Sequence, residues 1–165
     1  MKKELECSDS TRTKEMNFYM RTAYTAYSLA DLQTAIWHPD VGQCVISDEG
    51  AGKITIARAG DLSSHTTTAD GYVVINKIRS VNGTVTLEIP QNSNADKYMR
   101  RWIRYVSSTR TTNFHRTVMT VYDPAGGILY TFNGVTPQKY PDVSYDQTAG
   151  NITYTLLVAE IVEQS

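Results

Sequence analysis

Histidine and cysteine side chains are the residues of this sequence best suited to bind a metal or to act as a base or nucleophile. They are His38, His65 and His115 together with Cys7 and Cys44. No two of them lie at the short spacing that zinc sites use, and the cysteines form no C-x-x-C pair. We therefore expect no metal, no cofactor and two reduced thiols.

Acidic and glycine-rich segments are a second place to look for chemistry. Five acids of the first half lie mostly beside turn signals, where carboxylates usually cap backbone amides: Asp40, Asp48, Glu49, Asp61 and Asp70. The segments DEGAGK and DPAGGI suit hairpin turns and match no phosphate-binding loop. No catalytic motif is present, although catalytic groups can also converge from distant positions. The sequence therefore favours a binding or structural protein over an enzyme.

The composition is that of one folded domain with little net charge. The chain has 165 residues, of which 41% are hydrophobic, and its formal net charge is -1. A nearly neutral chain has no overall field that would concentrate it on nucleic acid or on an anionic membrane. The N-terminus is charged where a secretion signal needs an apolar run, and no segment has the apolar length of a membrane span. We expect no membrane anchor.

A strand followed by a helix is predicted in the middle of the chain. Residues 83–89 alternate strictly between apolar and polar, which predicts a strand with one dry and one wet face. Pro90 ends this strand, and Ser93 with Asp96 makes a capping box, so a helix should begin near Asn94. Apolar residues then recur at steps of three and four, which predicts one stripe packed on a sheet. They are Ala95, Tyr98, Met99, Trp102, Ile103 and Val106.

The other side of this helix is basic, and no acid interrupts the stretch from Lys97 to Arg116. In one interpretation, arginines follow the phosphates of single-stranded nucleic acid while aromatic side chains stack on its bases. The residues for that role are Arg100, Arg101, Arg104 and Arg110 with Tyr98, Trp102 and Phe114. In the other, Arg100, Arg101 and Arg104 face solvent or pair with carboxylates of another copy. The slightly negative net charge favours the second interpretation.

Strands are predicted for much of the first half. Segments 41–47, 53–59 and 71–78 alternate or run apolar, and turn-forming residues separate them. Residues 60–70 are polar and predict a long loop. Residues 24–37 fit a helix and a strand equally well.

The second half repeats this pattern of strands and turns. Residues 116–123 predict a strand that ends at the turn Pro-Ala-Gly-Gly. Asn133 and Gly134 follow the next apolar run and predict a hairpin turn, because both central turn positions require a positive φ. Residues 151–162 predict the last strand, so two linked hairpins would close the chain.

The order of these features resembles the tail tube proteins of contractile-tailed bacteriophages and, more distantly, the tube proteins of R-type pyocins and type VI secretion systems. The segments that carry the resemblance are SLADLQTAI, GKITIARAGDLSSHTTTADGYVVINKI, GTVTLEIPQNSNADKYMRRWI and VYDPAGGILYTFNGVTPQKYPDVSYDQTAGNITYTLLVAEI. They cover residues 27–162, and their order is more specific than any one of them. Residues 1–26 depart from the pattern, because this lead is longer and more charged than is usual in such proteins.

The resemblance implies a mainly β fold with one short α-helix: an antiparallel β-sandwich or half-barrel that completes a larger β-barrel in a hexameric ring. Residues 1–26 would be an N-terminal arm and residues 27–165 the tail-tube β domain. Stacked rings would form the hollow channel for genome delivery, with DNA passing through without sequence-specific binding. A contractile sheath, a tape-measure protein and baseplate or terminator proteins would be partners. The protein would belong to the virion tail after assembly in the host cytoplasm.

Two groups of polar residues are candidates for assembly contacts. Polar strand faces would look into the wet channel, and the candidates are Thr55, Thr84, Thr86, Glu88, Thr153 and Thr155. The loop 60–70 would contact the next ring, and its candidates are Asp61, Ser63, Ser64, His65, Thr67 and Asp70. A monomeric single-stranded nucleic-acid-binding β-barrel module is the alternative. A carbohydrate-binding sandwich has less support, because the chain has only two tryptophans.

Overall fold

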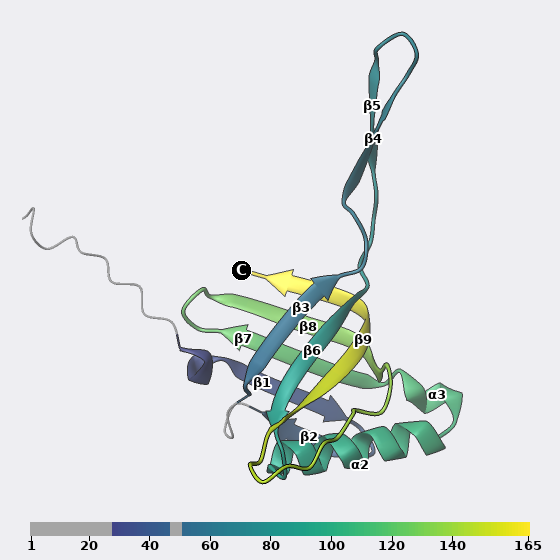
Figure 1. The fold of residues 1–165 in the computed structure, drawn as a ribbon. Coiled ribbons are helices and arrows are strands. Elements are labelled where there is room, and N and C mark those ends of the chain that lie inside the picture. Colours follow the sequence, from purple (N-terminus) through teal and green to yellow (C-terminus); the bar gives the residue numbers. More distant parts are fainter. Residues whose placement is uncertain (1–27, 47–50) are drawn as a thin grey trace, which may run out of the picture.

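The computed structural model describes residues 28–46 and 51–165, and its main element is a seven-stranded antiparallel sheet (Figure 1). The strand order is β2-β1-β7-β8-β9-β6-β3. The strands are β1 (Gln33–His38), β2 (Gly42–Val45), β3 (Lys53–Arg58), β6 (Gly83–Pro90), β7 (Thr117–Asp123), β8 (Ile128–Pro137) and β9 (Asn151–Gln164), and the helices are α2 (Asn94–Ser108) and α3 (Thr111–Phe114). The ambiguous segment 24–37 resolves into a 3-10 turn, η1 (Leu29–Asp31), followed by β1, while residues 24–27 lie outside the described part.

The sheet folds over itself and encloses one hydrophobic core. Figure 1 shows β3 and β6 crossing in front of β1, β7 and β8, with the long β9 joining the two parts. Val85, Leu87 and Ile89 of β6 are buried in one cluster with Ile36 of β1 and Met119 of β7. Full burial of such a side chain contributes roughly 1.5–3 kcal/mol. The predicted class, a mainly β sandwich or half-barrel with one main helix, is confirmed.

Helix α2 begins at Asn94, as predicted. The Ser93 hydroxyl accepts a hydrogen bond from the Asp96 amide at 3.0 Å, which satisfies one of the amides that a helix start leaves without a partner. All six apolar residues of the predicted stripe are buried, and α2 packs against β2 and β6. Trp102 also links the helix to β7, because it donates its indole N–H to the Thr117 hydroxyl at 3.0 Å. The helix therefore closes one end of the core.

The prediction of a hairpin turn at Asn133 and Gly134 is wrong. Both residues lie inside β8, and the register between β7 and β8 shifts beside them, so Gly134 is the extra residue of a β-bulge. Gly134 has a φ of 65°, and a Cβ there would lie 2.9 Å from the Cβ of Ala159. A bulge and a hairpin turn share the need for a positive φ. The β7–β8 turn lies at 124–127 as predicted, and residues 138–150 connect β8 to β9.

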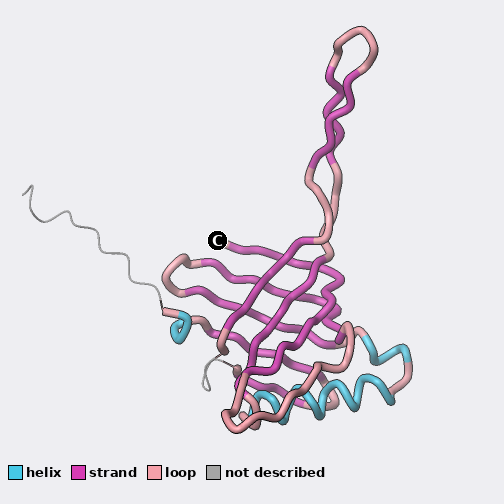
Figure 2. The backbone as a smooth tube through the Cα atoms, viewed as in Figure 1, coloured by secondary structure: helices cyan, strands magenta, loops and turns pink. Residues whose placement is uncertain are grey.

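The loop predicted at 60–70 is also wrong in part. Residues Ser63–Thr67 form strand β4, which pairs with β5 (Val73–Lys77) in a separate two-stranded sheet. Figure 2 shows this hairpin projecting far from the body between β3 and β6. Every residue of both strands is exposed. The strand predicted at 71–78 is therefore present, but it lies outside the main sheet.

Candidate assembly surfaces

The polar residues predicted to face a channel come from three neighbouring strands, β3, β6 and β9. They are Thr55, Thr84, Thr86, Glu88, Thr153 and Thr155. Thr86 lies directly opposite Thr55 on one side and Thr155 on the other. Glu88 lies opposite Thr153 in the next row of the same face. The structure thus brings all six onto one side of a three-stranded surface, because residues that pair across strands share a face.

This polar surface is the outer face of the sheet. Along β6, each of its polar residues is half-buried and each residue between them is buried. Successive side chains of a strand point to opposite faces, so one layer of backbone separates the polar rows from the core. Lys53 lies opposite Glu88 and adds a positive charge at one end of the surface. That this surface lines a channel remains a prediction.

The three arginines predicted to serve a neighbouring copy have different surroundings on α2. Arg100 donates from Nε to both carboxylate oxygens of Asp96, at 3.0 and 3.1 Å, and this hydrogen bond raises the pKa of Arg100. The Arg101 guanidinium lies 5.6 Å from the centroid of the Tyr98 ring, a cation–π distance. Arg104 is exposed. Since Arg100 has a carboxylate partner in its own helix, the prediction of a contact with another copy applies best to Arg101 and Arg104.

A buried carboxylate joins α2 to the sheet. Asp96 is only 1% exposed and accepts a hydrogen bond from the hydroxyl of Tyr154 on β9 and from the Asn92 amide, the latter at 3.1 Å. Burial, followed by the hydrogen bond to Asp96, raises the pKa of Tyr154, because a phenolate beside a carboxylate in a dry site is unfavourable. The sequence prediction did not include this pair. Alternation along β9 places Tyr154 on the dry face and was the signal that could have indicated it.

The stacking surface required by the nucleic-acid interpretation is absent from the described residues. Tyr98 and Trp102 are buried beneath α2, and Tyr98 donates its hydroxyl to the Gly42 carbonyl at 2.7 Å. Only Phe114, in α3, is exposed among the three aromatic candidates. Because bases stack only on accessible rings, that part of the alternative is wrong. Exposed Arg110 leads into α3, away from the stripe that holds Tyr98 and Trp102.

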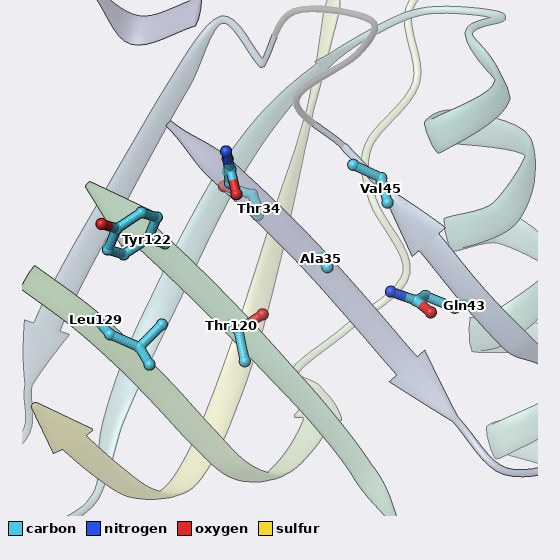
Figure 3. Close-up of a pocket in the computed structure, with 8 residues that line it drawn as sticks. Thr34, Ala35, Gln43, Val45, Thr120, Tyr122 and Leu129 are labelled. Carbon is cyan, nitrogen blue, oxygen red and sulfur yellow. The ribbon is translucent and has the colours of Figure 1, made fainter. Parts of the chain in front are cut away.

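A groove of about 550 Å³ lies on the outer face of the other part of the sheet (Figure 3). Its walls come from β1, β2, β7 and β8 and include Ala35, Gln43, Val45, Thr120, Tyr122 and Leu129. The lining is mostly apolar and holds no charged residue. Trp37 lies on the same face, opposite Gln43, and is 47% exposed. This face therefore differs from the threonine-rich face of β3, β6 and β9, and no sequence pattern singled it out.

The projecting hairpin exposes apolar side chains on β5 and beside it. Tyr72 is 74% exposed and Ile75 is 69% exposed, while Val73 and Val74 are each about half exposed. Across the hairpin these residues face the polar strand β4, where His65 lies opposite Ile75. An isolated two-stranded hairpin is only marginally stable in water. Such a surface is typical of an element that is covered by another molecule.

The histidines lie in three separate places. His38 is buried, accepts a hydrogen bond from the Asp40 amide at Nδ1 and donates from Nε2 to the Asn113 carbonyl, at 3.1 and 3.3 Å. His65 and His115 are exposed. In the part of the chain that the structure describes, no three side chains of metal-binding type are grouped. Within that part, no helix has the length and apolar character needed to cross a membrane.

Comparison with known sequences identifies the family. The profile described as bacteriophage PhiTE tail tube protein matches residues 24–164, which is most of the chain. The chain belongs to this tail tube family. The resemblance to phage tail tube proteins that the sequence predicted is thereby confirmed, and the family is a structural one rather than a class of enzymes. No curated protein sequence matches the chain.

Solved structures of contractile injection machines share the fold. A sheath/tube terminator chain of the extracellular contractile injection system PVC, in the extended state, aligns with a TM-score of 0.59 and 9% identity over 87% of this chain and 100% of its own length. A chain of the PVC sheath-tube complex in the extended state aligns with a TM-score of 0.55 and 11% identity, over 97% of this chain and 99% of its own length. The tube terminating cap of the anti-feeding prophage aligns with a TM-score of 0.55 and 11% identity, over 88% of this chain and 99% of its own length. At these identities the likeness shows the fold alone.

Proposed function

We propose that this protein is the subunit of a phage tail tube that assembles into hexameric rings, which stack into a hollow channel for the genome. Residues 27–165 are the tube domain and residues 1–26 an added arm. DNA moves along the lumen without sequence-specific binding. The chain has no catalytic role, and it assembles in the host cytoplasm before it becomes part of the virion tail.

The polar outer face of β3, β6 and β9 is the observation that carries this proposal. It belongs to a sheet whose two end strands, β2 and β3, each have one edge that pairs with no other strand in the described residues. Open edges favour pairing with another chain. A ring of copies joined through these edges removes the open edges and gives the threonine rows a water-filled interior to face. Family membership supports the same role.

The β4–β5 hairpin is the proposed contact between stacked rings. Ser63, Ser64, His65 and Thr67 lie on β4, while Asp61 and Asp70 flank that strand. The exposed apolar residues of β5 supply surface that a neighbouring ring would remove from water, at roughly 25 cal/mol for each Å². In the ring, Arg101 and Arg104 pair with carboxylates of the adjacent copy. Along the tail, the tube contacts sheath, tape-measure, and baseplate or terminator proteins.

Imaging of the purified protein tests the proposal. We expect light scattering to detect oligomers that grow with protein concentration, and negative-stain microscopy to show six-fold rings and tubes. Mixed with the sheath and terminator proteins of the same tail, the chain should form longer tubes. A protein that stays strictly monomeric at high concentration, with and without those proteins, contradicts the proposal. Single-strand binding that weakens steeply with salt would instead favour the nucleic-acid alternative.

A further inference from the structure

The groove on the outer face of β1, β2, β7 and β8 is an apolar surface that no described segment covers (Figure 3). Gln33, the first residue of β1, lines one end of it together with Tyr122 and Leu129, which lie beside Gln33 in register. Gln43 and Val45 of β2 line the other end. A volume of about 550 Å³ is within the range of sites that bury a ligand of several apolar groups.

The chain enters the described fold at this groove. The first described residue is Ser28, and η1 leads directly into β1, whose first residue lines the groove. The preceding 27 residues are therefore attached near the end of the groove that Gln33 lines. Eight residues of extended chain reach about 27 Å, at about 3.4 Å for each residue. Residue 20 of the same chain can thus reach any part of the groove from Ser28.

The composition of the arm selects one part of it as the occupant. Eight of the first fifteen residues are charged, and charged side chains are costly to bury in a groove without a counter-charge. The next five residues, MNFYM, carry no charge. In an extended segment Met16, Phe18 and Met20 share one face, while Asn17 and Tyr19 share the other. One face suits an apolar groove and the opposite face suits water.

We propose that residues 16–20 of the same chain bind in this groove, with Met16, Phe18 and Met20 against Val45, Tyr122 and Leu129. Gln43 and Thr120 of the lining offer hydrogen-bonding groups to the segment's backbone. The family profile begins at residue 24, so the contact belongs to this chain rather than to the shared tube domain. The proposal concerns a single molecule and does not depend on the proposed function.

Cysteine reactivity in the monomeric fraction tests the contact. In a chain with Cys7→Ser and Cys44→Ser, Val45→Cys places a thiol in the groove and Thr55→Cys places a control thiol on the threonine-rich face. The arm variant carries Met16→Ser, Phe18→Ser and Met20→Ser. We expect maleimide to label the Val45→Cys thiol at least tenfold faster in the arm variant than with the natural arm. A tenfold change corresponds to about 1.4 kcal/mol of docking. The Thr55→Cys thiol should react equally in both.

Four outcomes overturn or support the proposal. Equal labelling of the groove thiol with both arms overturns it. If Val45→Cys alters the fold, Thr120→Cys serves as the groove reporter in its place. Its thiol must then show the same slower labelling with the natural arm. A chain with Phe18→Cys and Thr120→Cys should form a disulfide within one molecule under mild oxidation. Disulfides only between two molecules would assign the groove to a sister copy and contradict docking within the same chain.

Discussion

The hydrogen bond from the Trp102 indole to the Thr117 hydroxyl shows how one polar atom pair supports the core. Both groups are buried, and the bond joins α2 to β7. Thr34, on the neighbouring strand β1, is equally buried, yet its hydroxyl has no hydrogen-bond partner among the described residues. A buried polar group is neutral or stabilising when it is paired and costly when it is not. The same substitution at the two threonines should therefore have opposite effects.

Thr117→Val should lower the free energy of unfolding by about 1–3 kcal/mol, because it leaves the Trp102 N–H buried without an acceptor. Thr34→Val should instead raise it by about 1 kcal/mol, because it removes a buried hydroxyl that lacks a partner. Thr120→Val, on the half-buried outer face of β7, is the matched control and should change it by less than about 0.5 kcal/mol. Urea denaturation of the monomer measures all three. Equal losses at Thr117 and Thr34 would contradict this account.

Two buried tyrosines predict a loss of stability in alkali. Burial is the main cause that raises the pKa of Tyr98 from 10.0 to about 12; electrostatic interaction with Cys44 raises this pKa further, and the charge of Arg101 lowers it. Between these values the unfolded chain loses the proton and the folded chain keeps it. Stability is therefore complete below pH 10 and falls as pH rises toward 12, by up to about 1.4 kcal/mol for each pH unit and each tyrosine. Tyr154 acts in the same direction.

Tyr98→Phe isolates one of these contributions. At neutral pH the variant should be less stable by about 0.5–1.5 kcal/mol, because the hydrogen bond to the Gly42 carbonyl is lost. Between pH 10 and pH 12 its unfolding free energy should fall less steeply than that of the parent. Urea titrations across this window, with tyrosinate absorbance, measure the difference. Tyr145→Phe is the control, since Tyr145 is 81% exposed. Parallel pH profiles for parent and Tyr98→Phe would exclude Tyr98 as a source of the loss.

At the scale of elements, strict periodicity was the reliable guide and isolated turn signals were not. The alternation in 83–89 and the three-and-four spacing of α2 each report one buried face, so β6 and the helix formed as predicted. Asn133 and Gly134 misled because a positive φ serves a bulge as well as a turn. Every residue of β4 is exposed, and the strand is defined by its pairing with β5. Its sequence therefore has no apolar periodicity from which the strand could be predicted. The groove was missed because two strand pairs far apart in sequence build it, β1 with β2 and β7 with β8.

The hairpin should be separable from the body. Replacing residues 62–78 with a two-residue turn removes only exposed strands and their connections, so the chain should keep its fold and its unfolding free energy within about 1 kcal/mol. We expect the shortened protein to form single rings and no tubes. Microscopy and light scattering compare it with the parent. A milder variant, Ile75→Ser with Val73→Ser, keeps the hairpin length and should shorten the tubes. Tubes of normal length from the shortened protein would refute the stacking role.

At the scale of the whole molecule, the sheet is an incomplete barrel with unlike outer faces. One face carries rows of threonine, and the other carries an apolar groove with Trp37 beside it. In a ring, the first would meet water inside and the second would lie toward protein. The family could be inferred from the order of motifs, but this difference between faces required the strand order, in which β3, β6 and β9 are neighbours although β9 is the last strand of the chain.

A cysteine on the threonine face should report the lumen. In a background with Cys7→Ser and Cys44→Ser, Thr55→Cys lies on an exposed part of β3. In monomers we expect a small maleimide and a large polyethylene glycol maleimide to react equally well. In tubes the small reagent should still react, while the large one should be excluded by the channel wall. Gel mobility after labelling distinguishes the two. Full reaction of the large reagent along intact tubes would place this face on the outside.

The regular alternation along β6 has a consequence for how such a protein can change over generations. Val85, Leu87 and Ile89 are buried in the core, while the half-buried residues between them lie on the opposite face of the strand. Substitutions on the half-buried face of β6 can therefore change the polarity and charge of that face while the buried face keeps its residues. If this face lines the channel of a tail tube, such substitutions would change the polarity and charge of the channel wall while the fold stays the same.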